Sequence, residues 1–195
     1  MKTLKLLTTL IIVLFATNAT AQDQASRFSF ELNGGPSFAL QELGDTDLKT
    51  GGGFEGLLHY RFMPHLGAYA GWGWNKFASN ETFEGADVDF EETGYVFGLQ
   101  FKHPINQSSL SWYVRGGGLY NHIEVENTDG DIIEDTGHGL GFHAGTGLHI
   151  QLSNKWSIIP SVTFHSLSRD LNSDGINTTL DLIYLSGRVG ILKTF

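Results

Sequence analysis

Residues 180–195 alternate apolar and polar side chains without interruption and end on an aromatic residue. Counted back by twos from Phe195, Ile191 and Val189 share its face, whereas Arg188 lies on the other face. Alternation of period two is typical of a β-strand with one apolar side. An apolar strand at a chain end exposes an edge that recruits other chains. We therefore expect this strand to pair with the first strand of its own chain and close a barrel.

Seven further segments show the same alternation, and each has the roughly 9 to 11 residues that a tilted strand needs to cross a hydrocarbon layer. The eight expected strands are residues 28–38, 51–62, 66–77, 93–103, 109–122, 137–151, 156–167 and 180–195. Long polar connections (39–50, 78–92, 123–136, 168–179) alternate with short ones (63–65, 104–108, 152–155). This rhythm predicts an all-β, eight-stranded antiparallel transmembrane up-and-down β-barrel, with its short turns and both termini in the periplasm.

The first 21 residues have the features of a secretory signal peptide. Two lysines precede an apolar run at residues 10–16, and Ala19-Thr20-Ala21 is a small-x-small cleavage site. The run is shorter than the roughly 20 residues of a spanning helix. We therefore expect a signal peptide at residues 1–21, cleaved after Ala21, and a barrel domain at residues 22–195. The absence of cysteine excludes disulfides, thiolate metal sites and a lipoprotein anchor.

Polar and charged residues occupy the strand face opposite the apolar one. A lysine or arginine on the lipid side costs about 2–4 kcal/mol at the bilayer midplane, so these side chains are expected to face the interior. The expected lumen polar network is Glu31, Glu55, His59, Arg61, Lys102, Arg115 and Arg188. An eight-stranded barrel is just wide enough for side chains to fill it. We expect charges of both signs to pair there, with Glu31 or Glu55 beside Arg188, and no open pore.

The chain resembles the small outer-membrane β-barrel proteins, the group that includes the OmpA transmembrane domain and the OmpX-like barrels. The resemblance rests on the signal site, the eight alternating segments and the terminal residues 187–195. It implies residence in the cell outer membrane, contact with outer-membrane lipid and a monomeric state. It also implies that Phe195 acts as the assembly signal read by the barrel assembly machinery. Lys193 departs from that signal, because an apolar or aromatic residue is commoner at its position.

One connection carries a possible metal motif. Asp170, Asn172 and Asp174 alternate before Gly175, and Asp181 occupies the twelfth position, which matches the ligand spacing of a calcium loop. The alternative is an acidic hairpin loop whose residue types favour turns. The other long connections are also acidic, and they either stay solvated or bind cations or basic partners. The net charge of −9 makes nucleic acid an unsuitable partner. No cofactor is expected apart from this possible calcium.

Histidines are the other candidates for chemistry. His59, His143, His149 and His165 share the expected inner face and form either a metal or base cluster or polar lumen filling. His143 and His149 are six residues apart on one strand, about 20 Å, too far for one metal. Lipid A deacylases are also eight-stranded outer-membrane barrels, but they carry a His and Ser pair that faces the membrane. Here His165 is followed by Ser166 and Ser168, and neither the spacing nor the inward face of His165 matches.

These patterns predict a non-enzymatic integral outer-membrane protein that acts as a structural scaffold or surface interaction protein with acidic extracellular loops. A narrow, porin-like channel for small solutes is the first alternative, and it would need a continuous wet lumen. A lipid A-modifying enzyme is the second.

Overall fold

The computed structural model describes residues 26–79, 88–127, 129–173 and 176–195, so the expected signal peptide lies outside the described residues. The described part contains nine strands. They are β1 (Phe28–Ala39), β2 (Gly51–Arg61), β3 (Leu66–Ala78), β4 (Val88–Pro104), β5 (Leu110–Asn127), β6 (Ile132–Asp135), β7 (Gly139–Gln151), β8 (Trp156–Ser173) and β9 (Ile176–Thr194). Among these residues there is no helix whose length and apolar character would suit a membrane crossing.

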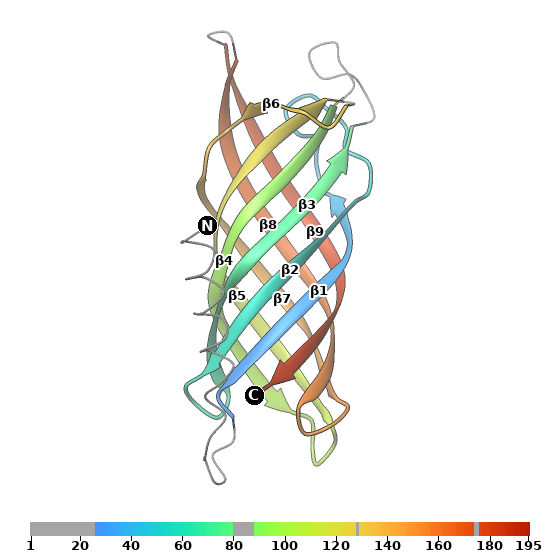
Figure 1. Cartoon of the computed structure of the whole chain (residues 1–195), viewed down its shortest axis with the longest axis vertical. Helices are drawn as coiled ribbons and strands as arrows, with labels where there is room; N and C mark the ends of the chain where they lie inside the picture. Colours follow the sequence, from blue (N-terminus) through green and yellow to red (C-terminus); the bar gives the residue numbers. More distant parts are fainter. Residues whose placement is uncertain (1–25, 80–87, 128, 174–175) are drawn as a thin grey trace, which may run out of the picture.

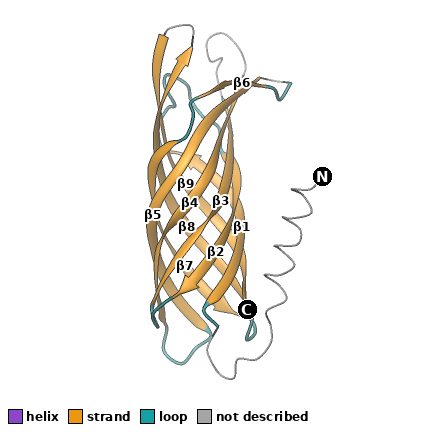
Figure 2. Ribbon diagram, turned by 60° about the vertical axis from the view of Figure 1, so that its left-hand side comes forward, coloured by secondary structure: helices purple, strands orange, loops and turns teal. Residues whose placement is uncertain are grey.

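Eight of the strands form a closed antiparallel ring, which confirms the predicted fold class. The strand order is β4-β3-β2-β1-β9-β8-β7-β5, and an additional pairing of β4 with β5 closes it. The first and last strands pair from Ser29 opposite Thr194 to Ala39 opposite Tyr184, as the chain-end pattern predicted. Figures 1 and 2 show the strands tilted around one elongated barrel, with the short β6 at the end opposite the short turns. There β6 pairs with β5 beyond the end of β7.

The strands extend further than predicted at the end opposite the short turns. β4 already begins at Val88, β5 continues to Asn127, and β8 and β9 remain paired as far as Ser173 and Ile176. The prediction that residues 88–92, 123–127 and 168–173 form polar loops was therefore wrong. The outward positions there include Asp89, Glu91, Glu124 and Glu126, whereas the inward positions between them are buried. A strand accommodates both sets of residues because its side chains alternate between the two faces.

The two faces of each strand differ as the alternation predicted. In β4, Tyr95, Phe97 and Leu99 are 58%, 43% and 54% exposed, whereas Val96 between them is buried. Aromatic residues mark the outward face near both rims, with Trp72 and Tyr120 among those nearer the longer connections. An apolar outer band with aromatic rims matches the hydrocarbon and interfacial layers of a membrane.

The buried side chains form layers along the barrel axis. A cluster of eleven apolar side chains, here named the outer plug, fills the end opposite the short turns. It consists of Leu43, Phe77, Val88, Phe90, Ile123, Val125, Leu167, Leu171, Leu180, Leu182 and Tyr184. Smaller apolar clusters surround Leu57 and, nearer the short turns, Tyr113. Polar residues occupy the lumen between and around them.

Candidate functional site: the filled lumen

Two buried ion pairs lie across the lumen. Nη1 of Arg115 lies 3.2 Å from Oε1 of Glu31, and Nη1 of Arg188 lies 2.8 Å from Oε1 of Glu55. Nη2 of Arg115 is also 3.9 Å from Oε2 of Glu55, so the two pairs are joined. Nε2 of His59 adds a contact of 3.0 Å to Glu31. The four charged side chains are 1–4% exposed, which places two cations and two anions in contact inside the barrel.

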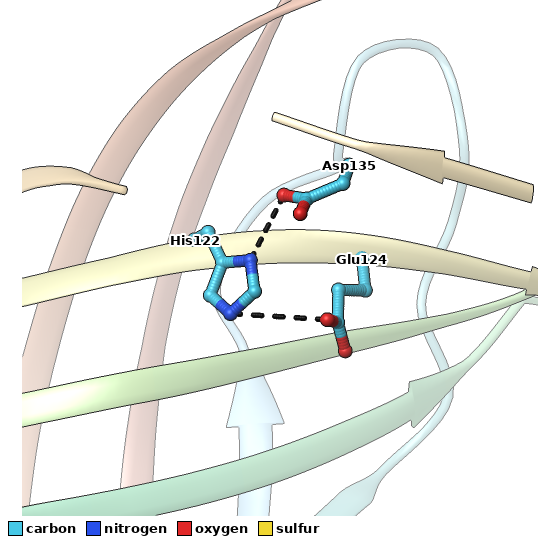
Figure 3. A group of neighbouring side chains, drawn as sticks. All are labelled: His122, Glu124 and Asp135. Atoms are coloured by element: carbon cyan, nitrogen blue, oxygen red, sulfur yellow. Dashed lines mark hydrogen bonds and ion pairs between the residues drawn. The ribbon is translucent and has the colours of Figure 1, made fainter. Parts of the chain in front are cut away.

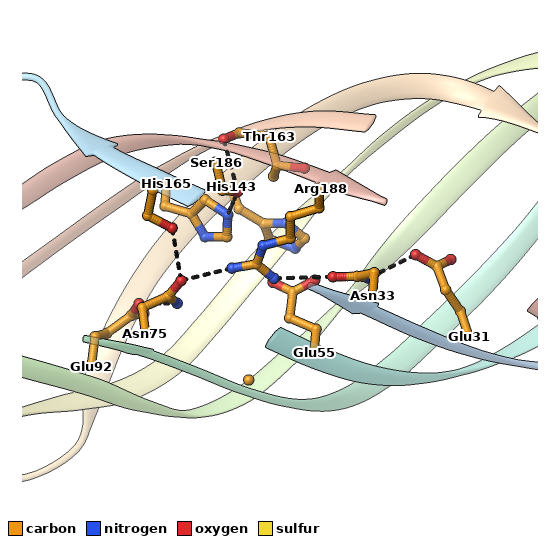
Figure 4. Close-up of polar contacts among 12 residues, drawn as sticks. Glu31, Asn33, Glu55, Asn75, Glu92, His143, Thr163, His165, Ser186 and Arg188 are labelled. Carbon is orange, nitrogen blue, oxygen red and sulfur yellow. Dashed lines mark hydrogen bonds and ion pairs between the residues drawn. The ribbon is translucent and has the colours of Figure 1, made fainter. Parts of the chain in front are cut away.

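Amide and hydroxyl groups extend this arrangement toward the outer plug (Figure 4). Oδ1 of Asn75 accepts hydrogen bonds from Nη2 of Arg188 at 2.8 Å and from Ser37 at 3.0 Å. Nδ2 of Asn75 donates to Oε2 of Glu92 at 3.0 Å, and the hydroxyl of Tyr184 donates to the same oxygen at 2.6 Å. We name the whole set the central polar network. It comprises Glu31, Asn33, Ser37, Glu55, His59, Asn75, Glu92, Arg115, Asn121, Tyr184 and Arg188.

Glycine makes room for these side chains at close strand contacts. A Cβ atom on Gly53 would lie 2.2 Å from Oδ1 of Asn75 and 2.4 Å from the backbone oxygen of Trp74. Both distances are too short for a methyl group at residue 53 unless the strand shifts. The absence of a side chain at Gly53 therefore leaves the space in which the amide of Asn75 reaches Arg188.

Arg61 and Lys102, the other expected members of the lumen network, lie closer to the short turns. Nη2 of Arg61 donates to the backbone oxygen of Ser26 at 3.3 Å. The backbone NH of Lys102 donates to His65 in a short turn, and its side chain is half-buried. The two expected cations therefore belong to the mouth of the barrel at the short turns and not to its centre.

The inner-face histidines are not gathered in one place. His143 and His165 are opposite each other on β7 and β8, with ring centroids 5.8 Å apart. Nε2 of His143 lies 3.0 Å from the hydroxyl of Tyr69, and Nε2 of His165 lies 3.2 Å from Oγ of Ser186. Nδ1 of each ring is buried without a hydrogen-bond partner in the described structure. His149 lies six residues further along β7, toward the short turns, and His59 contacts Glu31.

Sequence reasoning missed the outer plug and the role of Glu92. Glu92 was expected among the acidic residues of an exposed loop, but it is 1% exposed and binds Asn75, Asn121 and Tyr184. Phe90 was placed in the same loop and is fully buried. The alternation of period two would have identified Phe90 and Glu92 as inward-facing, because they lie an even number of residues from the buried Val96 on the same strand.

The residues of the expected calcium motif lie on both strands of the β8–β9 hairpin. Oδ1 of Asp170 accepts a hydrogen bond from Thr179, and Oδ1 of Asp181 accepts one from Ser168. Asn172 is opposite Asn177, and Asp174 lies outside the described residues. Asp170 and Asp181 are therefore held at different rungs of the ladder, on its exposed face. Calcium binding at these residues stays a prediction.

Phe195, the expected assembly signal, lies at the seam of the barrel, where the last strand β9 pairs with the first strand β1. Its backbone NH donates to the oxygen of Phe28 at 3.1 Å, and its side chain is 39% exposed. Nζ of Lys193 lies 5.4 Å from the ring centroid of Trp156 and 5.5 Å from that of Phe195. The lysine that departs from the expected terminal pattern therefore lies between two rim aromatics, where cation–π contact is favourable.

Residues 8–183 match the family model described as "Outer membrane protein beta-barrel domain". The chain belongs to this family. Membership of this family makes the protein an outer-membrane β-barrel. The apolar outer band and the closed ring of strands agree with this assignment. No curated protein sequence matches the chain.

Solved structures share the fold of this family member at low sequence identity. Neisserial surface protein A is 10% identical and has a TM-score of 0.61, with 88% of this chain and 98% of that chain covered. OprG from Pseudomonas aeruginosa is 13% identical, with a TM-score of 0.58 and coverage of 87% and 97%. A major outer membrane protein from Thermus thermophilus is 15% identical, with a TM-score of 0.54 and coverage of 88% and 100%.

Proposed function

We propose that this protein is a closed, non-enzymatic scaffold of the outer membrane that presents an acidic surface outside the cell. The observation that carries the proposal is the filling of the lumen. Joined ion pairs between Arg115, Glu31, Arg188 and Glu55 occupy its centre, and the apolar outer plug lies above them. A solute crossing the barrel would have to separate buried ion pairs and then pass an apolar layer, and both steps are costly.

The two alternatives have less support. A small-solute channel needs polar groups that remain available to water, whereas the arginines here are bound to carboxylates and amides. An enzyme needs an accessible base that a third group orients. His165 contacts Ser186, but it is 1% exposed and its Nδ1 atom has no partner in the described structure. These features favour a polar lumen filling over a catalytic pair.

The acidic surface is built on the strand extensions beyond the rim aromatics. Nζ of Lys76 lies 3.3 Å from Asp89 and 3.2 Å from Glu91, and it also contacts Glu126. Three carboxylates surround one lysine, so the group carries a net negative charge. Burial lowers the pKa of Lys76, but the hydrogen bonds to Glu126 and Glu91 more than offset it and raise this pKa above its ordinary value. A rigid anionic surface of this kind suits basic partner surfaces.

The apolar outer face and the pairing of β9 with β1 indicate the other partners, which are membrane lipid and the assembly machinery. The apolar band would contact outer-membrane lipid, and a single chain closes its own ring, so no second copy is needed. Phe195 would serve as the signal for the barrel assembly machinery, because it is exposed at the seam where the last strand must close. We propose a monomer on these grounds.

The orientation is testable by labelling single cysteines, because the chain has no cysteine of its own. Asp131→Cys places a thiol at the exposed β5–β6 connection, and Lys155→Cys is the matched position in an exposed short turn. We expect a membrane-impermeant maleimide to label Asp131→Cys on intact cells and Lys155→Cys only after lysis. The reverse pattern would overturn the proposed presentation of the acidic surface.

A further inference from the structure

A histidine and two carboxylates meet on the outer side of the barrel wall, outside the lumen (Figure 3). His122 and Glu124 lie on β5, and Asp135 ends β6, which pairs with β5 beside them so that Asp135 is opposite Glu124. The ligand atoms of the three side chains all lie within 4.8 Å of one another. His122 is only 9% exposed, although Tyr120, two residues earlier on the same face, is 45% exposed. Asp135 and His138, from the end of this hairpin and the segment that follows it, contact His122 and cover it on an otherwise open strand face.

The hydrogen bonding of His122 leaves one ring nitrogen directed at a carboxylate. Nδ1 lies 2.8 Å from Oδ1 of Asp135, a hydrogen bond that places a proton on Nδ1. Nε2 lies 3.8 Å from Oε1 of Glu124, which is beyond hydrogen-bond length. With the neutral ring in this tautomer, a lone pair on nitrogen faces a carboxylate oxygen. Two electron-pair donors in this arrangement repel each other unless a cation lies between them.

The supporting groups hold Asp135 and the covering segment in place. Oδ1 of Asp135 also accepts the NH of Gly137 at 2.7 Å, and Gly137 has a φ of 65° that favours glycine. Arg169 on β8 donates to the backbone oxygens of Gly137 and Thr136 at 3.0 and 3.2 Å. The ring of His138 stacks on that of His122, with centroids 4.2 Å apart. The imidazole of His122 is therefore fixed in both position and orientation.

The local charge also favours a cation. Lys76 lies on β3, which β4 separates from β5, and it is engaged by Asp89, Glu91 and Glu126. The ion pairs found for Glu124 and Asp135 in the described part of the chain both go to His122. If the imidazole is neutral, two carboxylates at this site lack a balancing charge. A divalent ion would balance both.

We propose that Nε2 of His122 and the carboxylate of Glu124 bind one divalent transition-metal ion of the zinc class, with water in the remaining positions. Asp135 is a positioning residue that fixes the tautomer through Nδ1, as carboxylates behind metal-bound histidines commonly do. Zinc bonds of about 2.0–2.2 Å place tetrahedral ligands roughly 3.4 Å apart, so the observed 3.8 Å needs a closure of only a few tenths of an ångström. The site is independent of the closed lumen and of the calcium motif.

Titration of Zn²⁺ into chelator-treated protein in detergent micelles, followed by calorimetry, tests the proposal. We expect one ion per chain. His122→Gln and Glu124→Gln should each abolish measurable binding, and Asp135→Asn should weaken it about 10- to 100-fold. The matched control Asp131→Asn removes an exposed carboxylate from the same hairpin and should leave affinity within about twofold. Heat-dependent gel mobility would verify that each variant is folded.

Electron paramagnetic resonance of bound Cu²⁺ gives a second readout that does not depend on affinity. We expect nitrogen hyperfine coupling in the wild type and its loss in His122→Gln. Absence of Zn²⁺ binding at millimolar concentration, or binding unchanged by both His122→Gln and Glu124→Gln, would overturn the assignment. In that event an imidazolium between two carboxylates would account for the cluster.

Discussion

Replacement of Arg188 by methionine is expected to leave an uncompensated charge inside the barrel. Glu55 is 3% exposed, and Arg188 provides its contact at 2.8 Å. The nearest remaining cation is Nη2 of Arg115 at 3.9 Å, which is already committed to Glu31 through its other nitrogen. Removal of one partner from a buried ion pair costs about 3–5 kcal/mol. Asn33 and Asn75 each also lose a hydrogen-bond donor, so we expect a value in the upper part of that range.

The double variant Arg188→Met with Glu55→Gln separates the charge effect from lost packing. Removal of both charges should restore about 2 kcal/mol or more relative to the sum of the single variants, because paired buried charges are replaceable at little cost. The free energies are measured by urea unfolding in lipid vesicles, with the fluorescence of the four tryptophans as the signal. A loss below about 1 kcal/mol for Arg188→Met, or strict additivity in the double variant, would refute a dry, ion-paired lumen.

Three further predictions use the same unfolding measurement. Phe90→Ala, at a fully buried position of the outer plug, should cost about 3–5 kcal/mol, and a loss below about 1 kcal/mol would mean that the plug is not packed. Gly53→Ala should cost about 1–3 kcal/mol, because its methyl group meets Asn75 and the Trp74 backbone; a neutral result would contradict the close strand contact. Lys76 has a pKa raised above its ordinary 10.5 by Glu126 and Glu91 despite burial, so its stabilising contribution is fully present below about pH 10 and falls as the pH rises further. The stability difference between the wild type and Lys76→Met should therefore be constant from pH 6 to 9 and shrink above pH 10, whereas a difference that shrinks toward neutral pH would contradict the raised pKa.

The inward position of the charged residues followed from the sequence because a strand has a strict period of two. Once Glu31 and Arg188 were assigned to strands, parity alone placed both in the lumen. Their partners depend on the stagger between strands, which the sequence pattern does not encode. Arg188 was expected to pair with either Glu31 or Glu55, and the structure places it against Glu55 and Asn33.

The outer plug was missed because charge density was interpreted as a loop signal. The outward positions of residues 88–92 and 123–127 carry carboxylates, namely Asp89, Glu91, Glu124 and Glu126, and these lie beyond the rim aromatics, where water faces the outer side of the wall. The residues between them include Phe90 and Ile123, which are fully buried. Alternation that continues past an aromatic rim therefore indicates a strand extension, even where the outward residues are acidic.

The cluster of His122, Glu124 and Asp135 depends on a tertiary contact that the sequence pattern does not predict. Asp135 reaches His122 because β6 folds back on β5 with a register shift between Val125 and Glu126. The sequence showed these carboxylates only as members of an acidic connection. The separation of 13 residues between His122 and Asp135 carries no recognisable metal-ligand spacing, so geometry was needed to bring them together.

Planar-bilayer recording of the purified wild-type protein tests the closed lumen most directly. The joined ion pairs and the outer plug predict a membrane current indistinguishable from that of a detergent blank, at either polarity and with monovalent or divalent salts. Reproducible ion-conducting steps whose number scales with the amount of inserted protein would contradict the account.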